Sequence, residues 1–354
     1  MERFTLPFEE PIREIESQIQ ALREETRDQG VDRERDIQEL ERRKKELTER
    51  IFSNLSAWDR VRVARHPSRP TCLEYVKQIL DDFTELHGDR RFGDDRAILA
   101  GFARLNGWKI CFIGQQKGRT TKEKLECNFG MPHPEGYRKA LRVMKLAEKA
   151  RLPIVTFIDT MGAYPGIGSE ERGVAEAIAV NLREMSRLRT PLLSVVIGEG
   201  GSGGALGLGT GDRLLMLEYA YYSVISPEGC AAILWRSGDE APKAAEALRL
   251  TAPDLAKLGI VDEVIREPLG GAHADPDGIA VTLRERLLAH LEELRRVPTD
   301  SLLDRRYEKY RRMAYYVEGN RMWNPVEQAA EREAEAVRRA AKRGEPSLQR
   351  DNGS

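Results

Sequence analysis

The stretch PLLSVVIGEGGSGGALGLGTG, from Pro191 to Gly211, decides the fold prediction for this chain. An apolar run typical of a buried strand leads into a segment with eight glycines, and the pattern then turns toward a short helix. Gly203 and Gly204 stand at the expected helix start, where backbone amides have no acceptor within the helix. Because neither residue has a side chain, both amides can approach an anionic oxygen, as in an oxyanion hole.

The same loop also fits other sequence motifs, and these predict chemistry different from that of an oxyanion hole. GxGxxG, from Gly198 to Gly203, would bind a dinucleotide, with Glu218 as its acidic residue. Only about seven residues lie between the loop and Asp212, too few for the crossover helix of such a unit. Two further readings have no reacting side chain: a cradle of backbone amides, or glycine chosen only for close packing.

GxSxG is also present, in Gly200, Ser202 and Gly204, and it is the turn that presents a serine nucleophile. Its partners would be Asp239 or Asp262, followed by His273 or His290. His273 lies in a glycine-rich segment, and His290 lies in a charged helical pattern that favours a solvated side chain. Neither histidine is therefore a good candidate for the base that a serine nucleophile needs.

A second loop of the same kind favours the amide cradle. The apolar run PIVTFI leads into DTMGAYPG, residues 159–166, and a helical pattern follows from Ser169 to Leu188. Loops at the carboxyl ends of neighbouring strands open at the same edge, so both glycine clusters can line one crevice. The candidate binding residues of the two loops are Gly162, Ala163, Tyr164, Gly166, Gly200, Gly201 and Ser202.

The chain closely resembles the carboxyltransferase α subunit of multisubunit, bacterial-type acetyl-CoA carboxylase. Five motifs carry the resemblance, in the order DTMGAYPG, EERG, GEGGSGGALGLGTGD, YSVISPEGCAAILW and EPLGGAH, and it extends from Phe4 to Tyr316. It implies an α/β fold of the crotonase-like (ClpP/crotonase) class, a superhelix of ββα units with an N-terminal helical hairpin. It also implies that a carboxyl group passes from carboxybiotin to acetyl-CoA, giving malonyl-CoA for fatty acid synthesis.

By this resemblance, Gly203 and Gly204 face the ureido carbonyl of biotin. Loss of the carboxyl group leaves negative charge on that oxygen, and removing a single oxyanion donor typically costs about 2.7 to 4 kcal/mol. The biotin enolate can itself take the methyl proton, so the resemblance implies no protein base. The oxyanion hole for the acetyl enolate is expected on the partner β subunit.

Two departures from the family pattern concern residues near these loops. The family has proline where Met161 stands and histidine where Gln115 stands. Proline would fix φ, so Met161 predicts a looser turn. Lys117 and Arg119 belong to the basic stretch QQKGRTTKEK, which predicts either a site for CoA phosphates or the carboxybiotin carboxylate, or a solvated loop.

Composition predicts a cytoplasmic protein. The chain has 354 residues and a net charge of −1, and its basic and acidic residues are interspersed, which argues against a nucleic-acid partner. The N-terminal sequence MERFTLPFEEP has no signal-peptide pattern, and no apolar run has the length of a membrane span.

Cysteine spacing indicates neither a disulfide framework nor a zinc site, so we expect no metal on this chain. The four cysteines are Cys72, Cys111, Cys127 and Cys230. By the resemblance, zinc belongs to the β subunit. Lys145 stands in VMKL within a helical pattern rather than a hairpin, so we expect biotin not to be attached there but to arrive on a biotin carboxyl carrier protein. The implied assembly is α2β2 and works with a biotin carboxylase.

Three regions follow from the patterning. Residues 1–65 predict a helical hairpin, because apolar residues recur at a three-four spacing on either side of Gly30. Residues 66–320 form the carboxyltransferase domain that the resemblance implies, and their pattern predicts a β-hairpin around Asn106 and Gly107. Residues 321–354 predict a charged helix and a polar tail.

Two rival functions remain open at this point. A crotonase-type hydratase or thioesterase that acts alone would need a carboxylate in the crevice, and the candidates are Glu170, Glu171 and Glu199. A catalytically silent scaffold would keep the fold and bind a partner through the helical hairpin.

Overall fold

The computed structural model describes residues 4–29, 31–313, 316–318 and 321–323. The chain divides into two compact units, Met1–Leu303 and Asp304–Ser354. Helix α14 (Thr299–Arg311) runs across this boundary, and in the second unit the short strands β9 (Tyr316–Glu318) and β10 (Arg321–Trp323) pair antiparallel. The helix predicted beyond residue 323 lies outside the described residues.

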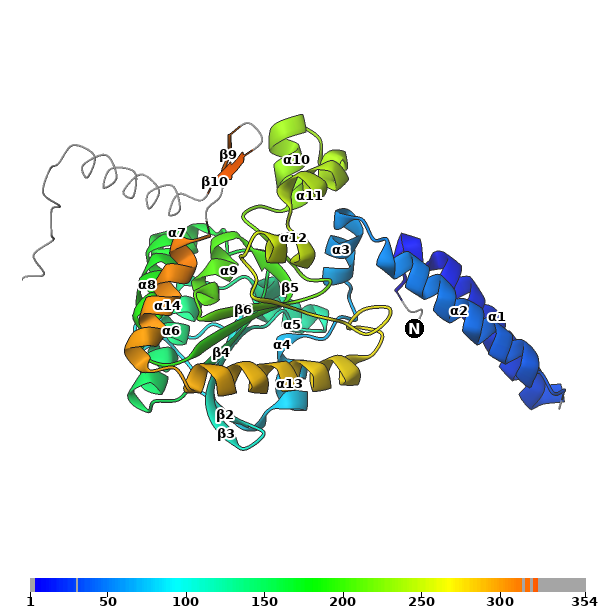
Figure 1. The fold of residues 1–354 in the computed structure, drawn as a ribbon, viewed down its shortest axis with the longest axis horizontal. Coiled ribbons are helices and arrows are strands. Elements are labelled where there is room, and N and C mark those ends of the chain that lie inside the picture. Colours follow the sequence, from blue (N-terminus) through cyan, green and yellow to red (C-terminus); the bar gives the residue numbers. More distant parts are fainter. Residues whose placement is uncertain (1–3, 30, 314–315, 319–320, 324–354) are drawn as a thin grey trace, which may run out of the picture. The chain divides into compact units, whose positions relative to one another are not determined.

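The N-terminal helical hairpin is present. The short helix η1 (Pro7–Glu9) leads into α1 (Glu10–Gln29), and α2 (Glu34–Ser53) runs back beside it (Figure 1). Ion pairs join Glu16 to Lys44 and Arg23 to Glu41. The later residue of α1 pairs with the earlier residue of α2, which is the order expected for antiparallel helices.

The base of the hairpin covers part of this chain's own core. Leu6, Ile12 and Phe52 pack with Val63 and Tyr219 into a small buried cluster. The Phe52 and Tyr219 rings meet edge to face with their centroids 5.7 Å apart. The apolar stripe predicted from the sequence is therefore used, at its base, for contact within the chain.

A mixed eight-stranded sheet forms the centre of the first unit. Its strand order is β1-β2-β3-β4-β5-β6-β8, and β7 pairs with β5. The strands are β1 (Asp81–Glu85), β2 (Ile98–Leu105), β3 (Trp108–Gln115), β4 (Ile154–Thr160), β5 (Leu192–Gly201), β6 (Arg213–Leu217), β7 (Tyr221–Ser223) and β8 (Glu263–Ile265). The predicted β2–β3 hairpin is confirmed: Asn106 and Gly107 have φ of +49° and +83°, as its two-residue turn requires.

From β3 onward the neighbouring strands are parallel, and every residue of β4 and β5 is buried. This is the pattern of strands covered on both faces. Helix α9 (Ser202–Gly209) packs against β4 and β5, and α6 (Pro134–Lys149) packs against β2 and β3. The carboxyl ends of β3, β4 and β5 therefore meet at one edge of the sheet (Figure 1).

The single helix predicted after the second glycine loop is in fact two helices. These are α7 (Ile167–Glu171) and α8 (Val174–Arg187), separated by Arg172 and Gly173. Gly173 has a φ of +77°, which is incompatible with a right-handed helix, so the helical pattern is broken there.

Further helices complete the first unit. They are α3 (Ala57–Ala64), α4 (Cys72–Ile79), α5 (Thr121–Glu126), η2 (Asn128–Gly130), α10 (Pro227–Trp235), η3 (Gly238–Glu240), α11 (Ala241–Leu248), α12 (Ala252–Lys257) and α13 (Pro276–Arg295). The chain order β2, β3, α6, with α5 and η2 between β3 and α6, and again β6, β7, α10 follows the ββα succession that the family resemblance implies. No helix in the described part of the chain combines the length and apolar character needed to cross a bilayer.

Candidate active site

The two glycine loops touch each other. β4 and β5 are neighbours with Thr160 in register with Gly200, so the loops that follow them begin side by side. A Cβ on Gly201 would lie 2.0 Å from the carbonyl oxygen of Met161, and one on Gly204 would lie 2.3 Å from the carbonyl carbon of Gly162. Real Cβ atoms do not approach backbone this closely, so both positions require glycine. The prediction that both loops share one edge is confirmed.

The amides of Gly203 and Gly204 lie in the first turn of α9, which begins at Ser202. They therefore have no acceptor within the helix, and the partial positive charge of the helix start favours an anion beside them. The Gly204 carbonyl accepts hydrogen bonds from Gln115 Nε2 at 2.8 Å and from the Tyr137 hydroxyl at 3.3 Å. Because Gln115 and Tyr137 are fully buried, they hold Gly204 in a fixed orientation.

Close packing does not account for every glycine in these loops. A Cβ on Gly203 would come no closer than 3.6 Å to Ile178, an ordinary contact, and a Cβ on Gly162 would meet nothing within 4 Å. Neither residue has a positive φ. Glycine at positions 162 and 203 is thus not required by the fold, which fits a backbone left accessible to a ligand.

The second loop is held by the Thr160 side chain. The Thr160 hydroxyl donates to the Gly162 carbonyl at 2.6 Å and accepts from the Gly162 amide at 3.1 Å. The Tyr164 ring packs over Gly166 and lies 4.3 Å from the His133 ring, while the half-buried Ala163 contacts Gly204. Met161 is exposed beside them, and the turn it was expected to loosen is braced by Thr160.

Gln115 connects the two loops. Its Nε2 donates to the Gly204 carbonyl, and its Oε1 accepts from the Asp159 amide at 3.0 Å. The sequence marked this residue only as a departure from the family pattern. Its bridging role depends on the strand neighbours of β3, which the sequence alone does not give.

Lys117 and Arg119 both have acidic partners. Lys117 Nζ lies 2.7 Å from Asp159 Oδ1 and 2.5 Å from Glu199 Oε2. Arg119 pairs with Glu74 and also donates to the carbonyls of Pro67 and Arg69. Neither residue offers an unpaired charge to an anion, and Lys117 is not part of a solvated loop, since only 20% of its side chain is exposed. Substrate contact by these two residues stays a prediction.

Glu199, the buried carboxylate of the rival hydratase reading, is held in its ionised form. It accepts from Arg65 Nε and from the Tyr221 hydroxyl, both at 2.7 Å, besides its pair with Lys117. Burial by itself would raise the pKa of Glu199, but the charges of Lys117 and Arg65 outweigh it and lower the pKa to about 2. A carboxylate with this pKa is poorly matched to proton transfer near neutral pH. Glu170 and Glu171 are exposed on α7.

The hypothesis of a serine nucleophile lacks its candidate base in the described structure. Ser202 has a φ of +49°, as a nucleophile turn would, but the candidate histidines have other partners. His290 bonds to Glu263 at 2.6 Å, and the His273 ring is stacked on the His66 ring. The expectation of a solvated His290 is wrong, because α13 packs against β8 and buries the imidazole against Glu263.

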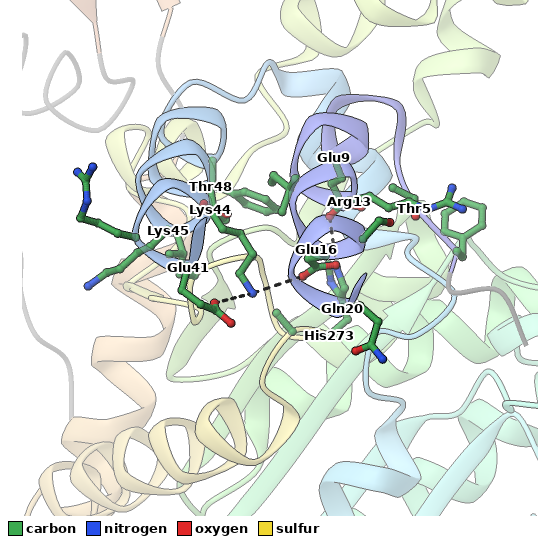
Figure 2. A pocket seen from close by; sticks show the side chains of 18 of the residues that line it. Thr5, Glu9, Arg13, Glu16, Gln20, Glu41, Lys44, Lys45, Thr48 and His273 are labelled. Carbon is green, nitrogen blue, oxygen red and sulfur yellow. Dashed lines mark hydrogen bonds and ion pairs between the residues drawn. The ribbon is translucent and has the colours of Figure 1, made fainter. Parts of the chain in front are cut away.

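A pocket lies between the helical hairpin and the loop that holds His273 (Figure 2). Glu9, His66 and His273 meet here, and they are the one group among the described residues whose ligand atoms lie within 4.8 Å of one another. The two imidazoles are stacked 3.8 Å apart at 16°. An ion bound by an imidazole lies near the plane of that ring, so these nearly parallel rings cannot share one ion without turning. We therefore assign no metal to this group.

Solved structures of similar architecture place the fold in a class. Transcarboxylase 12S with methylmalonyl-coenzyme A and methylmalonic acid bound has a TM-score of 0.52 at 21% identity, covering 62% of this chain and 41% of that one. A Pseudomonas malonate decarboxylase hetero-tetramer in complex with coenzyme A has a TM-score of 0.51 at 18% identity, covering 70% of this chain and 93% of that one. At these identities the likeness concerns the fold, which is the crotonase-like fold of carboxyltransferases, as predicted.

Sequence comparison then gives the family. The profile described as "Acetyl co-enzyme A carboxylase carboxyltransferase-like" matches residues 5–314. The acetyl-coenzyme A carboxylase carboxyl transferase subunit alpha of Geobacter metallireducens is 55% identical over 316 residues, which are 89% of this chain and 99% of that protein. The corresponding protein of Edwardsiella ictaluri is 56% identical over 315 residues, 88% of this chain and 98% of that one. The chain belongs to the family of acetyl-CoA carboxylase carboxyltransferase α subunits.

Replacing Ser202 by glycine separates an amide cradle from a serine nucleophile. We expect carboxyl transfer to stay within about threefold of the wild type, because the amides of Gly203 and Gly204 remain and the positive φ suits glycine. A nucleophilic serine would instead lose several powers of ten. Steady-state rates of the variant and the wild type, each assembled with its partner subunits, give the answer.

Proposed function

We propose that this chain supplies the biotin side of an acetyl-CoA carboxylase carboxyltransferase, which moves a carboxyl group from carboxybiotin to acetyl-CoA and forms malonyl-CoA. The observation that carries the proposal is the amide pair of Gly203 and Gly204. It lies at the start of α9, it is held through the Gly204 carbonyl, and at Gly203 the packing leaves room for a side chain that the sequence does not use.

The chemistry explains why amides suit this reaction. When the N–C bond of carboxybiotin breaks, its electron pair passes to the ureido group and CO₂ is released, so negative charge develops on the ureido oxygen. Donors that are already oriented stabilise this charge without reorganising. The biotin enolate then removes a methyl proton from acetyl-CoA, and the acetyl carbanion attacks CO₂. Each step balances without an acid or base from this chain.

The proposal requires other subunits. The acetyl enolate is a second oxyanion, and we assign its donors, together with zinc, to a β subunit in an α2β2 assembly. Biotin arrives on a carrier protein that a biotin carboxylase recharges, and no biotin is attached to this chain. The proposal includes a cytoplasmic location and no nucleic-acid partner, in keeping with the interspersed charges and the net charge of −1.

The reverse reaction tests the function. The complex is purified through a tag on this chain, and formation of acetyl-CoA from malonyl-CoA is followed with a biotin derivative as the acceptor. We expect turnover that requires the acceptor, and no turnover from this chain alone. A complex that contains the β subunit and its zinc but shows no acceptor-dependent turnover would overturn the assignment in favour of a scaffold.

A further inference from the structure

Three charged residues meet where three neighbouring strands end. Lys117 follows β3 by two residues, Asp159 lies near the end of β4, and Glu199 lies near the end of β5. Because β3, β4 and β5 are adjacent and parallel, the Lys117 ammonium reaches both carboxylates, at 2.7 and 2.5 Å. Asp159 is the first residue of one glycine loop, and Glu199 stands between Gly198 and Gly200 of the other.

We propose that Lys117 is a positioning residue, which fixes the two glycine loops relative to each other and thereby orients the Gly203 and Gly204 amides toward the carboxybiotin oxygen. This inference rests on the proposed function. Lys117 itself does not touch the reacting atoms in this proposal: it acts through Asp159 and Glu199.

A continuous set of hydrogen bonds leads from Lys117 to the amide pair. Asp159 Oδ1, which pairs with Lys117, also accepts from the Glu199 amide at 2.9 Å, so it already joins β4 to β5. The Asp159 amide donates to Gln115, whose Nε2 holds the Gly204 carbonyl. A shift of Asp159 would therefore move both the second loop and the support of Gly204.

The burial of this group makes the ammonium necessary. The exposed side-chain fractions are 20% for Lys117, 9% for Asp159 and 5% for Glu199. Burial alone would lower the pKa of Lys117, but the two carboxylates outweigh it and raise the pKa, so the ammonium stays charged. Removal of Lys117 would leave two buried carboxylates close together, and like charges disfavour ionisation of both.

Other charged or titratable groups surround the cluster. Arg65 and Tyr221 bond to Glu199, and Arg65 continues to Glu228 on α10. The remaining charged or titratable groups that act on Asp159 or line the adjoining small pocket are His66, Arg69, Cys72, Tyr75, Arg119 and Lys124. Arg65 partly compensates Glu199 when Lys117 is removed, so Asp159 is the carboxylate left with less support.

The test replaces Lys117 by methionine in the complex with the β subunit and uses the reverse reaction. We expect kcat to fall about 100-fold at pH 8, which is the loss typical when a catalytic group is displaced by about 1 Å. The KM for malonyl-CoA should stay within about threefold of the wild-type value. We expect partial recovery toward pH 6, because a carboxyl pair without its ammonium takes up one proton that can bridge the two groups. In the double variant Lys117→Met/Glu199→Gln the amide can donate to Asp159, so the rate should recover to within about tenfold of wild type at every pH.

A second readout keeps the inference independent of turnover. Hydrogen exchange of peptides covering 159–166 and 199–205 should become faster in Lys117→Met but not in Lys122→Met, a control at an exposed lysine of the same basic stretch. If Lys117→Met does not fold, the double variant Lys117→Met/Glu199→Gln is measured instead, because it lacks the unpaired charge of Glu199. It is compared with Glu199→Gln alone.

Each outcome decides the inference. Wild-type turnover with protected loops in Lys117→Met overturns it, and so does slow turnover with unchanged exchange, which would mean that Lys117 contacts the substrate directly. If the wild-type complex shows no biotin-dependent turnover, the proposed function fails, while faster exchange in both loops still supports the link that Lys117 makes between them.

Discussion

Replacing Gly204 by alanine is expected to reduce carboxyl transfer at least about 100-fold. The added Cβ would lie 2.3 Å from the Gly162 carbonyl carbon and 2.5 Å from the Ala163 amide nitrogen. Both atoms belong to backbone, so the clash can be relieved only by moving one loop away from the other. A displacement of about 1 Å in a catalytic donor is enough to cost a factor of that size.

The matched control is Gly203→Ala, in the same turn of the same helix. Its Cβ would lie 3.6 Å from Ile178, which is ordinary van der Waals contact, and the amide stays in place. We expect this variant to keep the packing of both loops and to lose less of the rate than Gly204→Ala, because its methyl group narrows the crevice but displaces no backbone. Both variants are compared in the reverse reaction, with near-UV circular dichroism to check packing. Equal losses in the two variants would mean that bulk in the crevice, and not contact between the loops, limits the reaction.

The second large effect concerns stability. Arg69 lies in the connection between α3 and α4, and Glu267 lies in the loop after β8; their side chains are 4% and 0% exposed. Arg69 donates two hydrogen bonds to Glu267 and a third to the Ile197 carbonyl of β5. Arg69→Met would leave the Glu267 carboxylate buried without its cation, and breaking such a pair typically costs about 3 to 5 kcal/mol.

Urea unfolding of the chain, followed by circular dichroism, measures this loss as a lower midpoint. The control is Arg42→Met on α2, because Arg42 forms ion pairs with Glu39 and Glu46, and the three side chains are 60 to 62% exposed. We expect no measurable shift from the control, since exposed pairs contribute little. The Glu267 carboxylate also accepts hydrogen bonds from the Tyr219 and Ala272 amides. If these two bonds were enough to stabilise it, the urea midpoint of Arg69→Met would shift as little as that of the control.

Local patterns predicted the elements around the site well. The apolar run from residue 192 became β5, which extends to Gly201, the following glycines up to Gly209 became part of α9, and Asn106 and Gly107 formed the expected hairpin turn. These features depend on side-chain periodicity and on residues with special backbone freedom, both of which are visible in the sequence. The pattern failed at Gly173, where a positive φ divides the predicted helix in two.

The charged part of the site was not predictable in the same way. Lys117 was expected either to meet a substrate anion or to be solvated, but it is enclosed by Asp159 and Glu199. His290 was expected in solvent, but it is buried beside Glu263. The partners of these groups lie 27 to 82 residues away along the chain, and only strand order and helix packing bring them together.

The sequence by itself determined the family, the alternation of strands and helices and the position of the amide pair. Glycine, proline and apolar residues act through the backbone and through burial, whose effects are local or periodic. The tertiary structure decided which glycines are required by contact, which carboxylates Lys117 joins, and that Gln115 links the two loops. Those facts follow from the neighbours of each strand in the sheet, because hydrogen bonds and ion pairs depend on distances of a few ångströms that no spacing along the chain specifies.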